Sequence, residues 1–364
     1  MAGSVNLGLT VLVDLAPVRE LVLDPRRLGS AQHRSSWSDE FERRYREVEA
    51  AMDHLALPRT WQGRSPAWVD QHLELAAELV LQLGELRGEY ARTRAWGDHL
   101  LEIVTDGSAP WRAELMLRLS EVHRVSGNQE RTAALVRQAA DLLHLLDLSP
   151  EEVHALAPIS CHALLCLGSL AMVEDRPDEA RTLLGHAWSH GTDSNEHLWS
   201  LVGFALVEAG DGHHDAALAL EDAAIAMAER LEDLRALQAT RNNRACTLRQ
   251  LGRLDEAYAE FADLLPTILA EDIPDVVLTS AEDFACVLFD IGREQDGALL
   301  VGAAMAERDA AGVPRLDFQD ASIEVSIAAG RARLGHDWDT LVERGAALGV
   351  LAAVASALRP ATER

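Results

Sequence analysis

Lysine is absent from this sequence of 364 residues, so all 33 of its basic side chains are arginine. The phosphate-binding lysine of a P-loop, the Schiff-base lysine of pyridoxal phosphate enzymes and the ATP-binding lysine of protein kinases are therefore all missing. The chain by itself cannot be an ordinary member of any of these three enzyme classes.

Basic charge is also scarce beside acidic charge. The 33 arginines stand against 59 aspartates and glutamates, which gives a formal net charge of -26 at pH 7. Duplex nucleic acid and anionic membranes are both bound through clustered basic side chains, so this balance argues against either partner. No uncharged apolar stretch reaches the roughly 18 residues of a membrane span, and no secretory signal is visible. We therefore expect a cytoplasmic protein that binds neither nucleic acid directly nor a membrane.

Signatures of catalysis and metal binding are missing as well. The sequence has no G-x-S-x-G, no glycine-rich phosphate loop and no C-x-x-C among its four cysteines, which we interpret as buried free thiols. His186 and His190 stand four positions apart and His197 could join them, so a metal site there stays open beside the simpler interpretation of solvated histidines. We predict no catalytic residue, no metal and no cofactor, and hence no enzyme.

The chain divides into three parts by composition. Residues 1–37 form an N-terminal extension, with a short strand expected at Val5–Leu15 and a linker rich in Arg, Ser and Gly after it. A lone strand is not stable in water, so this extension either packs on the helices after it or belongs to a missing domain. Residues 38–359 show helical periodicity throughout, and residues 360–364 are expected to be a disordered tail.

An internal repeat organises the helical part. The segment LRQLGRLDEAYAEFADLL (Leu248–Leu265) has five weaker copies, and 37 to 48 residues separate the turn positions of successive copies. These turn positions are Gly88, Gly127, Asp175, Gly212, Gly252 and Gly292. A small residue five positions later, as in Ala180, Ala217, Ala257 and Gly297, allows two helices to approach closely. The pattern predicts an all-α fold, a right-handed superhelical solenoid of about six to seven helical hairpins.

Two stretches resemble known families. The segment NNRACTLRQLGRLDEAYAEFADLL resembles a tetratricopeptide repeat. Gly297–Pro314 and Ala328–Leu348, with the motifs L-x-G-A-A and E-x-G-A-A-L, resemble the end of the helical sensor arm in ATP-binding LuxR-type and AfsR-like bacterial transcriptional regulators. The resemblance implies sensing of a protein or small ligand. The sequence lacks the NTPase motif and the basic recognition helix of such regulators, so it is either an excised arm or a free-standing relative.

Candidate binding residues come from the first helix of each hairpin, which lines the concave side of such a solenoid. Counting back from each turn gives exposed positions with arginine and amide donors, which suit a carboxylate or a peptide backbone. The alternative is that Asn242, Asn243 and Arg249 only fix the packing between repeats. The predicted groove residues are Arg118, Glu121, Arg124, His162, Ser169, Trp199, Asn242, Asn243 and Arg249.

These features together predict a binding module rather than an enzyme. The expected partner is a protein, a peptide or an amphiphilic small molecule, within a bacterial signalling or transcription-control system. The alternative function is a free-standing helical scaffold in a biosynthetic or assembly complex, and an enzyme with a pocket inside the superhelix is a third, least favoured class. The sequence leaves the oligomeric state open.

Overall fold

The computed structural model describes residues 39–81, 83, 88–143, 159–190, 195–271, 273–315 and 317–359. The regular elements in these ranges are 17 helices, with no strand among them. This confirms the predicted all-α class. The strand expected at Val5–Leu15, the extension of residues 1–37 and the tail of residues 360–364 lie outside the described residues.

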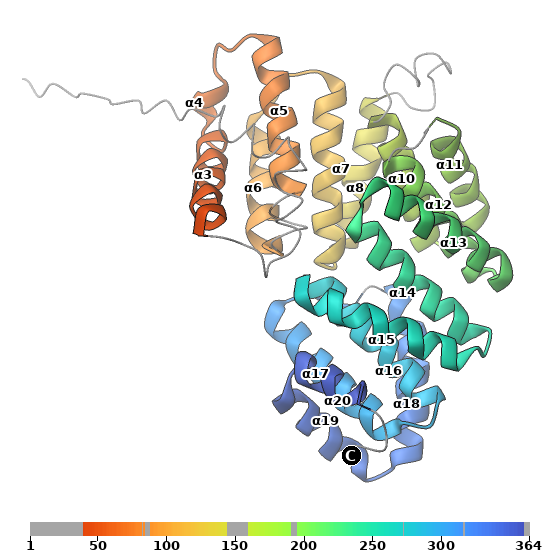
Figure 1. Ribbon diagram of the computed structural model, residues 1–364. Helices are drawn as coiled ribbons and strands as arrows, with labels where there is room; N and C mark the ends of the chain where they lie inside the picture. Colours follow the sequence, from red (N-terminus) through yellow and green to blue (C-terminus); the bar gives the residue numbers. More distant parts are fainter. Residues whose placement is uncertain are drawn as a thin grey trace, which may run out of the picture.

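The helices follow one another in the order of the chain (Figure 1). They are α3 (Asp39–Leu55), α4 (Pro58–Trp61), α5 (Pro66–Leu81), α6 (Tyr90–Ile103), α7 (Ala109–Val125), α8 (Gln129–Leu142), α10 (Ile159–Val173), α11 (Pro177–His190), α12 (Asn195–Gly210), α13 (His214–Leu231), α14 (Leu234–Gln250), α15 (Leu254–Glu271), α16 (Pro274–Asp290), α17 (Glu294–Ala311), α18 (Asp317–Leu334), α19 (Asp337–Leu348) and α20 (Val350–Ala357).

Six pairs of consecutive helices, from α7–α8 to α18–α19, pack on each other as hairpins, and α5 and α6 form a seventh, loosely packed pair. Each hairpin turn contains one residue with φ between +56° and +81°, and these residues include all six turn positions expected from the repeat. Asp175 adopts this left-handed conformation without being glycine, which short polar residues tolerate better than most. Such a residue ends a helix because the next N–H groups turn back to the last carbonyls, as Arg253 N–H does to the carbonyl of Leu248. The expected six to seven hairpins are therefore confirmed.

Small residues lie where the two helices of a hairpin meet. Ala180, Ala217 and Ala257 have no exposed surface. A Cβ atom at Gly297 would lie 2.6 Å from the Phe289 ring, so a larger residue does not fit there. The spacing rule read from the sequence thus reflects helix packing.

The closest helix approach is between α17 and α19. A Cβ atom at Gly302 would lie 2.1 Å from the carbonyl oxygen of Val342, and one at Gly345 would lie 1.9 Å from that of Leu299. Both glycines are therefore required by direct backbone contact. They are the glycines of the L-x-G-A-A and E-x-G-A-A-L motifs, so these motifs have a packing role.

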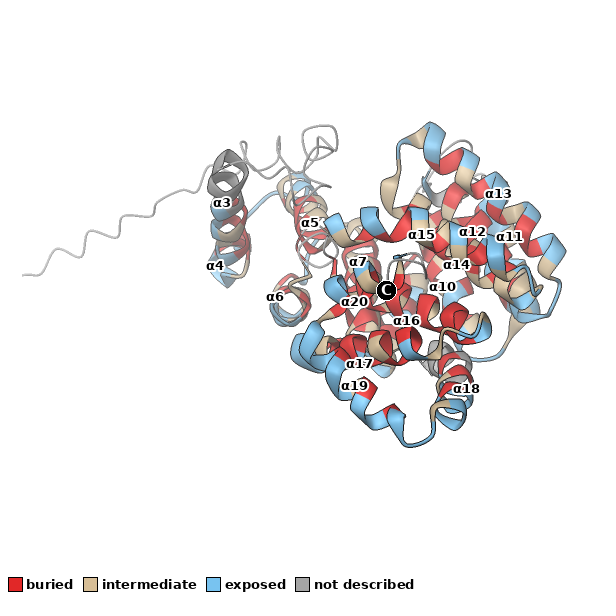
Figure 2. Cartoon of the chain, turned by 60° about the horizontal axis from the view of Figure 1, so that its bottom comes forward, coloured by how far each residue is buried: buried red, intermediate tan, exposed pale blue. Residues whose placement is uncertain are grey.

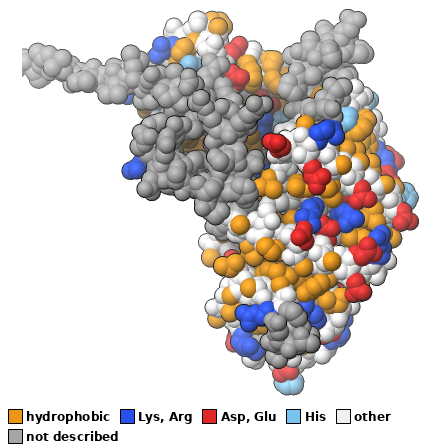
Figure 3. Space-filling view, in the orientation of Figure 1, with side chains coloured by type: hydrophobic (Ala, Val, Ile, Leu, Met, Phe, Trp, Pro, Cys, Tyr) orange, Lys and Arg blue, Asp and Glu red, His pale blue; other side chains and the backbone are white. Residues whose placement is uncertain are grey.

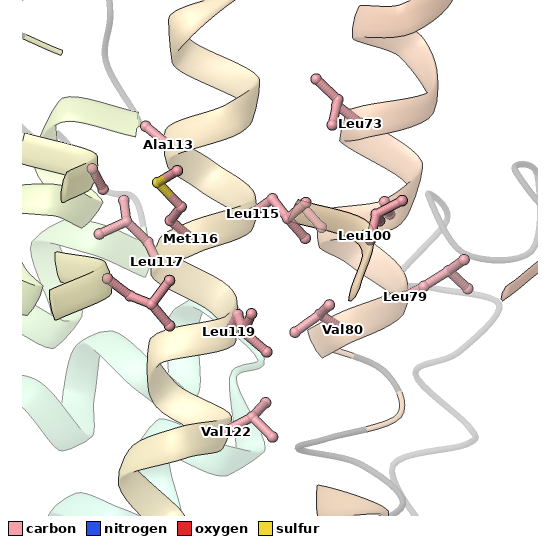
Figure 4. Packing of buried hydrophobic residues seen from close by; sticks show 14 of the residues in the cluster. Leu73, Leu79, Val80, Leu100, Ala113, Leu115, Met116, Leu117, Leu119 and Val122 are labelled. Atoms are coloured by element: carbon pink, nitrogen blue, oxygen red, sulfur yellow. The ribbon is translucent and has the colours of Figure 1, made fainter. Parts of the chain in front are cut away.

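The core runs between consecutive helices. In Figure 4, Leu115 and Leu119 of α7 point toward α5, whereas Met116 and Leu117 point to the opposite side of the helix. All four are buried. A helix that is apolar on two sides lies between neighbours, as an inner helix of a solenoid must. Figure 2 shows the same principle over the described helices, with buried residues on the sides that face other helices.

The first helices of successive hairpins contact one another in order, α7 with α10, then α12, α14, α16 and α18. We call the surface that they line the interior. Figure 1 shows that the solenoid curves strongly, so that α14 to α20 lie below the N-terminal helices. Among the described residues no single helix is long and apolar enough to cross a membrane; α19 and α20 pass that test only when joined, and they meet at 116°.

Candidate functional site

The interior contains two groups of polar side chains. The first group joins α7 to α10, where Glu114 is 6% exposed. One of its carboxylate oxygens lies 2.6 Å from Nε of Arg118, and the other lies 2.9 Å from Nδ1 of His162. Glu78 of α5 lies 3.8 Å from the same arginine. One buried carboxylate is therefore held by two cations from two inner helices.

Charge pairing determines the protonation of this group. Burial alone would raise the pKa of Glu114, but the charges and hydrogen bonds of His162 and Arg118 lower it to about 2. Burial alone would lower the pKa of His162, yet the Glu114 carboxylate and the Cys166 thiol beside it raise it well above 6.5. The carboxylate and the imidazolium are thus both charged at neutral pH.

A second ion pair extends the first group across the interior. Arg124 donates to Glu121 over 2.8 Å, and its pKa is raised by Glu121 and, further off, by Asp275 of α16. The pKa of Glu121 is lowered because Arg124, Arg235 of α14 and His162 outweigh its burial. Charges from α7, α10, α14 and α16 therefore act on one another.

The second group joins α14, α16 and α18. Asn242 donates from Nδ2 to Asp283 over 2.8 Å. Arg249 donates to Asp290 over 2.6 Å and to the Ser326 hydroxyl of α18 over 2.7 Å. Donors on α14 are paired with carboxylates on α16, so the group forms a row of polar contacts between these two helices.

In the second group burial outweighs charge pairing, so the pKa values of its acidic side chains are raised. Burial raises the pKa of Asp283, and hydrogen bonds from Asn242 and Cys246 lower it only in part. Burial and the Asp283 charge raise the pKa of the Cys246 thiol well above 9 and that of Cys286 to about 12. The group therefore favours uncharged thiols and a carboxyl that ionises later than usual.

The predicted groove residues occupy different surroundings. Arg118, Glu121, Arg124 and His162 come together in the first group, while Asn242 and Arg249 lie in the second. Trp199 packs half-buried in a separate apolar cluster, Ser169 is exposed, and Asn243 is half-buried with its carbonyl facing the Thr247 hydroxyl at 3.1 Å. Whether any of them binds a ligand stays a prediction.

The histidine-rich segment has other contacts. His197 stacks on Trp188 with ring centroids 3.4 Å apart, and His186 is exposed. Within the described ranges, no three His, Cys, Asp or Glu side chains are placed to hold a metal ion.

Sequence reasoning missed Glu114, the centre of the first group. Counting back one further turn from Gly127, the step that found His162 from Asp175, would have reached it. The i,i+4 spacing of Glu114 and Arg118 was a second signal. Arg235 and Asp275 begin their helices, and only the curvature of the solenoid brings them to α7.

Comparisons with known proteins add little. Neither a protein family nor a curated protein matches the chain. A crystal structure of the nearly identical TPR-like repeats of a putative kinesin light chain from Podosopora anserina is similar to part of it, at 17% identity and a TM-score of 0.40. The match covers 55% of this chain and 96% of the other. The all-α fold follows from the helices and turns described above.

Proposed function

We propose that the protein is a binding module without enzymatic activity that recognises a protein, a peptide or an amphiphilic small molecule in its interior. One observation supports this most. The side chains of Arg118, Arg124, His162 and Arg249 are between 19% and 27% exposed, although they lie on inner helices. Packing between inner helices requires only apolar contacts, and ion pairs are seldom better than apolar side chains for stability. Charges retained within reach of water there are available to a ligand.

The chemistry of the interior narrows the ligand. Each of these cations already has a carboxylate partner, so a bound group has to fit between alternating charges. The net charge of -26 repels a polyanion at long range. On the face shown in Figure 3, arginine and acidic side chains are intermingled. A weakly charged or cationic peptide, or an apolar molecule with one carboxylate, fits this pattern best, with Trp199, Leu206 and Met172 beside its apolar part.

The biological setting rests on the resemblance of Gly297–Leu348 to the sensor arms of bacterial regulators. On that basis we propose a role in cytoplasmic signalling or transcription control, through a protein or small-ligand contact and without direct contact with nucleic acid or membrane. The scaffold alternative is favoured by one finding: Gly302 and Gly345, the glycines of the resembling motifs, are both explained by helix packing. The same interior would then bind a component of an assembly.

Peptides selected from a random display library on the full chain test the proposal. We expect Arg249→Ala and Asn243→Ala each to weaken binding of a selected peptide by roughly 10-fold, since charge-assisted hydrogen bonds contribute about 1–3 kcal/mol. Arg253→Ala is the matched control, because the Arg253 side chain is 43% exposed and pairs with Glu256 three residues on. Peptides that bind all three variants equally would refute the interior as the binding site.

A further inference from the structure

Two loops of the C-terminal half repeat the same short pattern. Each has a buried aliphatic residue followed by proline: Ile273–Pro274, where α16 begins, and Val313–Pro314, before α18. Both prolines lie against glycines of N-terminal hairpin turns. A Cβ atom at Gly88 would lie 3.0 Å from Pro274, and one at Gly127 would lie 2.5 Å from Pro314. The two contacts are the same interaction made twice, one hairpin apart.

A hydrogen bond and an apolar contact also join the N-terminal hairpins to these two loops. The Tyr90 hydroxyl donates to the Asp275 carboxylate, 185 residues further along the chain. In both proline–glycine contacts, nearly the same number of residues separates the proline from the glycine. Val313 is 3% exposed and belongs to the hydrophobic cluster of the N-terminal hairpins. We call four interactions the closing contact: the two proline–glycine contacts, the Tyr90–Asp275 hydrogen bond and the packing of Val313 on the N-terminal cluster. Together they join one turn of the superhelix to the next.

A buried ion cluster fixes the second loop. Glu282 is fully buried and accepts hydrogen bonds from Arg308 and Arg315, at 2.8 Å in each case. Arg308 also donates to the carbonyls of Val313 and Pro314, over 3.2 and 3.3 Å. The loop is therefore held in shape by its own half of the molecule, and the contact with Gly127 is made by a rigid surface.

We expect the closing contact to open more easily than the hairpin packing around it, because it consists of only a few side-chain contacts. Gly127 and Pro314 touch at the rim, where both are exposed, whereas Gly88 and Pro274 are half-buried and Val313 is 3% exposed. A few contacts of this kind open at lower free energy than a helical core. The interior, with Arg124 and Asp275 on its two sides, lies next to it.

We propose that the closing contact is a latch: it holds the solenoid in a closed turn, and its opening widens the interior for a partner. The inference rests on the proposed function only in saying that a protein, peptide or small-molecule partner enters the widened interior. Opening itself is a property of the free chain and is measured without a ligand.

The full chain offers a matched pair of variants. Gly127→Ala and Gly252→Ala both place a side chain at nearly the same left-handed conformation, φ +74° and +73°. Only the first meets a neighbour, because a Cβ at Gly252 has nothing within 4 Å. The backbone strain is thus common to both variants, and the difference between them reports the closing contact.

The readouts are the radius of gyration from solution scattering and the rate at which a maleimide labels Cys246 in the interior. We expect Gly127→Ala to be larger and to label at least about threefold faster than Gly252→Ala, because local opening governs access to a half-buried thiol. Pro314→Ala combined with Gly127→Ala removes the clashing atom and should restore the slow rate. Equal size and equal rates in the two glycine variants would overturn the latch.

Tyr90→Phe keeps the test decisive in case Gly127→Ala fails to fold. It removes one hydroxyl from the closing contact, and Tyr258→Phe, whose hydroxyl faces the Ala357 carbonyl at 3.3 Å, is its control. Faster labelling in Tyr90→Phe alone supports the latch, and equal labelling in both contradicts it. A latch that opens in a chain that no selected peptide enters would refute the proposed function and leave the latch intact.

Discussion

The contact between α7 and α10 and the contact between α13 and α14 each bury a glutamate, with opposite results. Glu114 is 6% exposed and has a pKa of about 2, whereas Glu221 of α13 is 1% exposed and has a pKa of about 7. Burial is nearly equal, so it does not explain the difference. Two cations bind both oxygens of Glu114. Among the described residues, Thr247 donates to Oε1 of Glu221, and nothing lies within hydrogen-bond distance of its Oε2.

The surroundings of Glu221 suit a protonated carboxyl. Thr247 Oγ1 lies 2.8 Å from Glu221 and 3.1 Å from the Asn243 carbonyl, which can only accept. A protonated Glu221 can donate to the Thr247 hydroxyl, which then donates to the Asn243 carbonyl, so the single hydroxyl proton of Thr247 no longer has to serve two acceptors. Arg244 lowers the pKa of Glu221 in part, but it already pairs with Asp222 and Glu260. In this solenoid the partners of a buried acid, rather than its depth, determine its charge.

The largest expected effect comes from removing the charge of the first glutamate. Glu114→Gln removes the carboxylate that His162 and Arg118 share, and we expect it to lower the free energy of unfolding by about 3 kcal/mol at pH 7. Because the folded pKa is depressed, this stabilisation is present above pH 4.5 and is lost as pH falls through about 2. Urea unfolding at pH 7 and pH 3 measures it.

A matched control separates this pair from ordinary ion pairs. Glu256→Gln removes the carboxylate of the exposed Arg253–Glu256 pair and should change the free energy of unfolding far less than Glu114→Gln does. If the two variants have equal effects, the Glu114 group is no more than a surface ion pair and the contrast between the two buried glutamates fails.

The second effect has the opposite sign. The raised pKa of Glu221 means that its contribution to stability is complete below pH 4.5 and is lost as pH rises through about 7. Glu221→Gln should therefore raise the free energy of unfolding by about 2 kcal/mol at pH 8 and change it little at pH 4. Thermal or urea unfolding over this pH range measures the slope. A variant less stable than the unaltered chain at pH 8 would show that Glu221 is ionised and paired.

Much of the fold is readable from the sequence because hairpin geometry imposes local rules. The left-handed turn residues and the buried Ala257 follow from constraints within about ten residues. The partners across the interior do not. Asp275 meets Tyr90 only because the solenoid curves back on itself, and curvature sums small rotations over many hairpins. The pairing of Glu114 with His162 likewise joins two residues that are 48 positions apart in the sequence.

The two motifs at the C-terminal end also show what the sequence alone does not reveal. L-x-G-A-A and E-x-G-A-A-L are detectable as patterns, yet a pattern does not say whether its glycines contact a ligand or a helix. The backbone approach of α17 to α19 answers that question for Gly302 and Gly345. The sequence predicted where the chain repeats, and the structure was needed to say what the repeats bring together.

The smallest expected effect tests the second polar group. Asp283 has a raised pKa and accepts from Asn242, and an asparagine oxygen can accept the same hydrogen bond. Asp283→Asn should therefore change the free energy of unfolding at pH 7 by less than about 1 kcal/mol, far less than Glu114→Gln. The thiols should respond more, because the Asp283 charge is one cause of the raised pKa values of Cys246 and Cys286. Removing that charge lowers both values, so maleimide labelling of Cys246 should begin at lower pH in the variant while the melting temperature stays constant. An unchanged labelling profile would mean that Asp283 is already neutral at pH 7. A large loss of stability would mean that Asp283 is charged and stabilised by its partners, as Glu114 is. Either result would change which buried acids of this solenoid count as paired.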